Sequence, residues 1–168
     1  MPDKRWPDLD ILATKTLEAC RSAKLRVTTA ESCTGGLIIG ALTEIGGSSD
    51  VVGRGFITYS NDAKMTMLGV STATLECDGA VSQATVRQMT SGALSAAGDD
   101  ADIAVAVSGV AGPGGGSKEK PVGTVWIAVE RRGSPAYTER QLFPGDRRAV
   151  RQKTVIRALE LIMETAER

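Results

Sequence analysis

Two short polar segments contain the residues whose types could do chemistry. In the first, Ser32 follows a β-branched run and precedes a pair of glycines, so its hydroxyl could act as a nucleophile on a strand-to-helix turn. In the second, Lys64 falls in the first turn of a helix that Asn61 is expected to cap. The helix dipole and partial burial both disfavour the charged amine there, which makes Lys64 a candidate general base. The alternative interpretations are a serine that only caps a helix and a solvated surface lysine.

The turn after Ser32 favours the binding of an anion. Thr34, Gly35 and Gly36 precede an apolar stripe with helical spacing, and glycines let backbone N–H groups approach a ligand closely. Such a turn at the positive end of a helix suits a phosphate, a carboxylate or a developing oxyanion. We therefore expect these three residues to contact the substrate.

A third polar segment, 108–116, is rich in glycine and follows the apolar run 103–107. It matches neither a P-loop nor a dinucleotide fingerprint, so a surface loop remains the alternative to a binding loop. Arg147, near the start of the last expected helix, could reach a phosphate. The expected contacts from the loop are Ser108, Gly109, Gly112, Gly114 and Gly115.

The chain has no histidine, which excludes a Ser-His-Asp triad, a Cys-His pair and a histidine metal site. A general base must then be Asp, Glu, Lys, Tyr, Cys or water. Cys20, Cys33 and Cys77 lie far apart and form no CxxC, so neither a disulfide framework nor a zinc site is expected. We expect no metal and no cofactor.

The pattern of apolar residues predicts the elements that position these segments. Strands and helices mostly alternate, which indicates an α/β protein with a mixed sheet covered by helices on both faces. The turn 131–135 predicts that the last two strands pair antiparallel. Five strands are expected, at 26–31, 51–59, 103–107, 125–130 and 137–143, with helices over 8–22, after Gly36, from Asn61, after Ser82 and from about Asp146.

Composition narrows the class of protein further. The 168 residues fit one domain, 1–168, of average globular composition. Twenty basic and twenty acidic residues give zero net charge, which disfavours a nucleic-acid partner. The charged start of the chain is unlike a signal peptide, and no apolar run would span a membrane. We expect a cytoplasmic protein without a membrane partner.

Four ordered blocks of sequence resemble the CinA C-terminal domain family, over about residues 10–165. The resemblance implies a three-layer α/β/α sandwich with a five-stranded mixed, mostly parallel sheet. It also implies hydrolysis of the carboxamide of nicotinamide mononucleotide (NMN) to nicotinic acid mononucleotide and ammonia, in pyridine nucleotide recycling. Some relatives carry an N-terminal pyrophosphatase domain, whose activity we expect to be absent. The blocks are Ala30–Gly36, Gly55–Lys64, Ser108–Gly116 and Lys120–Val125.

The family resemblance also implies a serine–lysine dyad, which motif position assigns to Ser32 and Lys64. Ser49 is a second family-typical serine and keeps the choice of nucleophile open. Tyr59 is expected to orient the lysine or to donate to an intermediate, and Asn61 to contact substrate.

The sequence leaves an alternative function open and also suggests an oligomeric state. The alternative function is a non-catalytic nucleotide-binding module associated with competence or DNA damage. A homo-oligomer is expected, with Val51, Val52 and Met67 as apolar positions that could pack against a partner or within the chain's own core.

Overall fold

A five-stranded sheet forms the middle layer of the molecule, which we describe for residues 8–168 from a computed structural model. The strand order is β2-β1-β3-β4-β5. β1 pairs parallel with β2 and β3, whereas β4 pairs antiparallel with β3 and β5. Four of the five strands therefore run in one direction, as a mixed, mostly parallel sheet requires. The strands are β1 (Val27–Glu31), β2 (Val52–Ile57), β3 (Ile103–Gly109), β4 (Thr124–Arg131) and β5 (Tyr137–Leu142).

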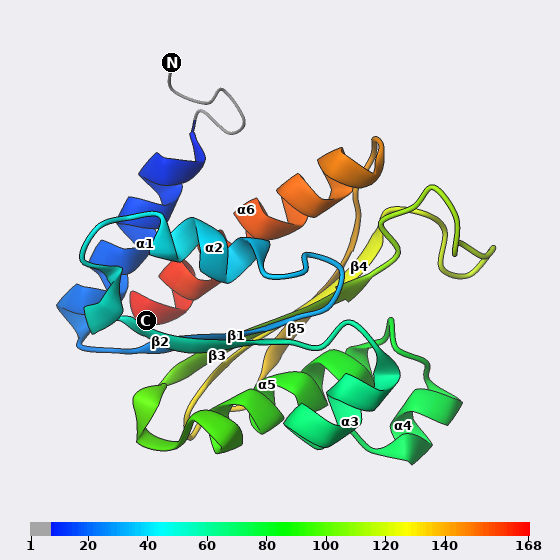
Figure 1. Ribbon diagram of the computed structural model, residues 1–168, viewed down its shortest axis with the longest axis horizontal. Coiled ribbons are helices and arrows are strands. Elements are labelled where there is room, and N and C mark those ends of the chain that lie inside the picture. The colour runs from blue at the N-terminus through cyan, green and yellow to red at the C-terminus, as the bar shows by residue number, and fades with distance from the viewer. Residues whose placement is uncertain (1–7) are drawn as a thin grey trace.

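Helices cover both faces of this sheet and complete the expected α/β/α sandwich (Figure 1). One face carries α1 (Leu9–Ala23), α2 (Leu37–Thr43) and α6 (Arg147–Ala166). The other carries α3 (Asn61–Leu68), α4 (Thr72–Cys77) and α5 (Gln83–Ala97). Two short 3₁₀ helices, Ser48–Asp50 and Gly98–Asp100, complete the described elements.

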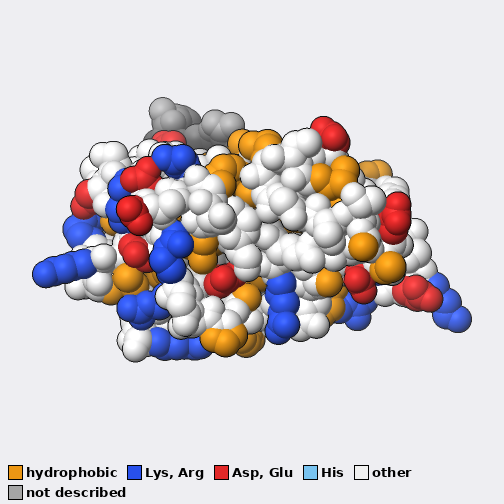
Figure 2. All heavy atoms as spheres, turned by 90° about the horizontal axis from the view of Figure 1, so that it is seen from below, with side chains coloured by type: hydrophobic (Ala, Val, Ile, Leu, Met, Phe, Trp, Pro, Cys, Tyr) orange, Lys and Arg blue, Asp and Glu red, His pale blue; other side chains and the backbone are white. Residues whose placement is uncertain are grey.

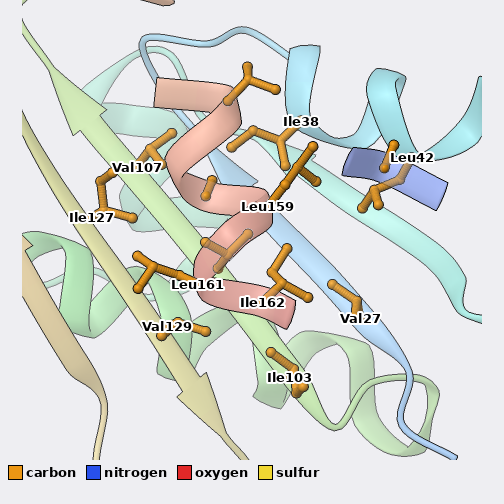
Figure 3. Packing of buried hydrophobic residues seen from close by; sticks show 14 of the residues in the cluster. Val27, Ile38, Leu42, Ile103, Val107, Ile127, Val129, Leu159, Leu161 and Ile162 are labelled. Carbon is orange, nitrogen blue, oxygen red and sulfur yellow. The ribbon is translucent and has the colours of Figure 1, made fainter. Parts of the chain in front are cut away.

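Two hydrophobic cores hold the layers together. The larger core packs α6 and α2 against the sheet, and Leu159 and Ile162 of α6 are fully buried in it together with Val107 of β3 and Ile127 of β4 (Figure 3). The smaller core lies under α5, whose Met89 is fully buried. The apolar spacing of these long helices matches the faces they bury.

Several details differ from the sequence-based expectations. α4 was not predicted, because none of its residues is buried and it therefore carries no apolar stripe. Ser60, not Asn61, caps α3, since the Ser60 hydroxyl accepts a hydrogen bond from the Ala63 N–H. Val51 and Val52 pack inside the larger core and are not available to a partner.

The surface on the side of α3, α4 and α5 carries hydrophobic side chains only in small separate patches (Figure 2). Met67 of α3 is 45% exposed. Among the described residues, no helix has both the length and the apolar character needed to cross a membrane.

Candidate active site

Four chain segments meet at one edge of the sheet. Because β2, β1 and β3 are parallel neighbours, the segments that follow them lie side by side at their carboxyl ends, where α/β proteins bind ligands. β5 runs in the same direction, so α6, which follows it, begins at the same edge. Topology thus brings the three polar segments of the sequence together with the start of the last helix.

Ser32 and Lys64 are in direct contact at this edge. Lys64 Nζ lies 3.0 Å from Ser32 Oγ. It also donates to the carbonyl oxygens of Thr58 at 2.9 Å and Tyr59 at 3.4 Å. The lysine side chain is only 1% exposed and that of Ser32 is 7% exposed. The two residues expected as nucleophile and base are therefore neighbours, and both are almost fully buried from solvent.

The surroundings of Lys64 favour its neutral form. Burial lowers the pKa of the amine below its ordinary value. A neutral amine has two N–H donors and one lone pair, and two of its three partners are carbonyls that can only accept. The lone pair can therefore accept the proton of the Ser32 hydroxyl, which is the arrangement that a general base requires.

Cys33, which directly follows Ser32, is not an alternative nucleophile. Cys33 is buried, and burial raises the pKa of its thiol to about 12. The thiol thus stays protonated at neutral pH and is a poor nucleophile.

Glu31 occupies the start of α2 and changes the role expected of the glycines. This fully buried carboxylate accepts hydrogen bonds from the N–H groups of Gly36, Ile38 and Ile39 and from the Thr34 hydroxyl. The Gly35 N–H is also occupied, since it donates to the Ser32 carbonyl. The expectation that the Gly35 and Gly36 N–H groups bind substrate is therefore wrong, because internal acceptors already hold them.

Arg147 joins two of the segments at the site. Its guanidinium donates to the carbonyl oxygen of Gly112 at 2.9 Å and to the Tyr59 hydroxyl at 3.2 Å. The Tyr59 side chain is 64% exposed, so its ring lies at the rim, while its carbonyl faces Lys64.

Two cavities adjoin at this edge. The smaller, of about 300 Å³, is lined by the dyad together with Tyr59, Asn61 and Ser108. The larger, of about 830 Å³, is lined by the start of α6 and includes Arg148. Arg147 and Ala111 line both cavities, so the cavity beside the dyad adjoins a larger one that is lined by Arg147, Arg148 and Arg151.

The remaining expected site residues divide into two groups. Gly109 lines the smaller cavity. The carbonyl of Gly112 accepts a hydrogen bond from Arg147, which also lines this cavity. Gly114 and Gly115 are exposed and line neither cavity. Ser49 is exposed in the 3₁₀ helix that precedes β2, at the end of the sheet opposite to the dyad. The structure therefore does not bring Ser49 to Lys64, and of the two candidate serines Ser32 is the one that contacts the amine.

Sequence reasoning missed the roles of Glu31 and Arg151. Glu31 stood within a recognised block, and its place three residues before Thr34 and five before Gly36 is the only indication that it caps α2. Arg151 donates to the carbonyl oxygens of Cys33 and Thr34, both at 3.1 Å. No local pattern could reveal that contact, because more than a hundred residues separate the partners.

Comparison with known proteins identifies the family to which this sheet and this site belong. The model of the CinA C-terminal domain matches residues 9–166, and the chain belongs to this family. Among its relatives is the nicotinamide-nucleotide amidohydrolase PncC of Enterobacter agglomerans, 51% identical over 95% of this chain and 94% of that one. The protein of the same name from Pseudomonas putida is 52% identical over 91% and 94%.

A solved structure agrees with these sequence relatives. The competence/damage inducible protein CihA of Agrobacterium tumefaciens superposes with a TM-score of 0.89 at 50% identity, covering 94% of each chain.

Proposed function

We propose that the protein is a nicotinamide-nucleotide amidohydrolase that converts NMN and water to nicotinic acid mononucleotide and ammonia. One observation carries the proposal: a buried lysine amine with lowered pKa lies 3.0 Å from the hydroxyl of Ser32 in a cavity. The names of the relatives support the substrate, since proteins about half identical over most of their length are named for this activity.

The reaction proceeds by acyl transfer through Ser32. The neutral amine of Lys64 takes the hydroxyl proton as Ser32 Oγ forms a bond to the carboxamide carbon. The protonated lysine then gives that proton to the amide nitrogen, the C–N bond breaks and ammonia leaves. Water attacks the resulting ester, Lys64 accepts its proton, and the proton returns to Ser32 Oγ as nicotinic acid mononucleotide departs.

The two cavities suit the two ends of NMN. The smaller one is large enough for a nicotinamide ring beside the dyad. The phosphate lies in the larger cavity, which Arg147, Arg148 and Arg151 line. The cytoplasmic location, the self-association and the lack of a nucleic-acid partner remain predictions from sequence.

Ammonia release from NMN tests the proposal and separates it from a nucleotide-binding module without chemistry. Ser32→Ala and Lys64→Met should each lower kcat by about 10⁴-fold or more, and the double variant should lose little beyond either, because the two groups act as a unit. Ser49→Ala is the matched control and should keep full activity. Loss of activity in Ser49→Ala, with normal turnover in Ser32→Ala, would assign the nucleophile to Ser49.

A further inference from the structure

The turn that carries Ser32 is held by α6, through Arg151, which also lines the larger cavity. Arg151 Nε donates to the carbonyl oxygen of Cys33, and a terminal nitrogen of the same guanidinium donates to that of Thr34. Both bonds are 3.1 Å long. One side chain therefore fixes two successive peptide planes directly after the candidate nucleophile.

These contacts determine where the N–H groups of the turn point. In a trans peptide the C=O and N–H directions are opposite, so the Thr34 N–H points away from Arg151. The Gly35 N–H, whose peptide plane Arg151 fixes through the Thr34 carbonyl, donates to the Ser32 carbonyl at 3.1 Å. That bond in turn directs the Cys33 N–H to the opposite side of its own peptide.

The Cys33 and Thr34 N–H groups have no acceptor in any other residue of the part of the chain that the structure describes. Neither donates a hydrogen bond to another residue of 8–168, although Cys33 is 5% exposed and Thr34 is fully buried. Buried backbone N–H groups without a partner are rare in folded proteins because each one costs free energy. By contrast, the neighbouring N–H groups of Gly35, Gly36 and Ile38 all have internal acceptors.

We propose that the Cys33 and Thr34 N–H groups bind the oxyanion of the tetrahedral intermediate and that Arg151 is the residue that positions them. The inference rests on the proposed amide hydrolysis. When Ser32 Oγ bonds to the carboxamide carbon, the C=O electron pair moves to oxygen, and that charge needs nearby donors. Cys33 lines the same cavity as the dyad and directly follows the nucleophile, where hydrolases with a nucleophile on such a turn place one donor.

Arg151→Met tests the proposal, because it removes both donors and keeps a long side chain. We expect kcat for NMN to fall about 10- to 100-fold, by more than KM rises, since a misdirected donor loses part of the 10²–10³-fold effect of a deleted one. Lys153→Met is the matched control: it lies on the same helix and also loses a bond to a backbone carbonyl, that of Pro144, away from the turn. Its kcat should match that of the wild type.

A substrate with sulfur in place of the carboxamide oxygen distinguishes this role from general support of the turn. Sulfur accepts hydrogen bonds weakly, so thio-NMN gains little from the two N–H groups. The ratio of the NMN rate to the thio-NMN rate should fall about tenfold in Arg151→Met and stay at the wild-type value in Lys153→Met. Arg151→Lys, which can donate to one carbonyl, should give an intermediate ratio and serves if the methionine variant does not fold.

Three other outcomes of these assays would contradict the inference or the proposed function. An unchanged ratio, with or without a lower kcat, would overturn the inference and leave the proposed function standing. A raised KM with normal kcat would mean that Arg151 binds substrate and does not position the turn. Failure of the wild type to release ammonia from NMN would refute the proposed function, and the inference with it.

Discussion

Replacing Glu31 with glutamine should destabilise the fold, although the two side chains have nearly the same shape. Both carboxylate oxygens of Glu31 are used: Oε1 accepts from the Ile39 N–H, and Oε2 accepts from the Gly36 and Ile38 N–H groups and the Thr34 hydroxyl. A glutamine can place its amide oxygen at only one of the two positions. Its NH₂ group must then face a buried N–H donor.

The cost follows from the bonds that are lost. If the amide oxygen replaces Oε2, the bond from Ile39 is lost, and a hydrogen bond to a charged group contributes about 1.5–3 kcal/mol. Removing a negative charge from the start of a helix costs a further 0.3–1 kcal/mol or so. The free energy of unfolding should thus fall by about 2–4 kcal/mol, which lowers Tm by roughly 5–15 °C in a protein of this size.

Urea unfolding and calorimetry of Glu31→Gln measure this loss, with Glu130→Gln as the matched control. Glu130 also accepts two side-chain hydrogen bonds, from Thr90 and Ser91, but both reach the same oxygen. A glutamine oxygen can replace that atom, so the control should change stability by less than about 1 kcal/mol. Equal stabilities of the two variants would refute the account of Glu31 as the acceptor that holds α2.

Three further predictions concern Lys64, two glycines and an ion pair. Burial lowers the pKa of Lys64 from 10.5, so between the lowered value and 10.5 the unfolded state binds more protons than the folded state. Stability relative to Lys64→Met should therefore rise with pH across this range, which denaturation profiles check. Wild-type kcat/KM should rise as pH passes through the lowered pKa and then level off, because the folded enzyme is deprotonated above it, which a rate profile checks. Gly92→Ala should lower the free energy of unfolding by about 1–3 kcal/mol, because the new Cβ would lie 1.9 Å from a backbone oxygen of α3. Gly40→Ala has open space around its Cβ and should leave the free energy of unfolding unchanged or raise it by about 0.5–1 kcal/mol in the same unfolding assay. Arg157 lowers the pKa of Glu139, so Arg157→Met should lower the free energy of unfolding by about 1–2 kcal/mol at neutral pH. The difference in stability between the variant and the wild type should shrink as pH falls through the lowered pKa of Glu139, which acid denaturation checks.

The sequence was most informative where a long element buries a regular face. The last helix was predicted from Asp146, and Asp146 does cap α6. All five strands were found, but for different reasons: β1, β3 and β4 are apolar or β-branched runs, whereas β5 is mostly polar and follows the turn 131–135 that pairs it with β4. α4 could not be found in this way, since it has no fully buried residue and only Leu75 of its side chains packs against the smaller core.

The candidate site could be predicted in part. Ser32 and Lys64 follow parallel strands, so their meeting at one edge follows from strand order. Ser49 precedes β2, and the same rule places it at the other edge, but the expectation for it came from family resemblance alone. The acceptors that occupy the Gly35 and Gly36 N–H groups depend on three-dimensional contacts that no spacing reveals.

The contacts of α6 bear on when the protein can become active during its synthesis. The serine turn leaves the ribosome early, whereas the arginines that hold it and Tyr59 belong to the final element of the fold. A nascent chain that ends before Arg147 contains both members of the dyad but lacks the side chains that fix their surroundings. The contacts that fix the surroundings of the dyad therefore form only after α6 has been synthesised.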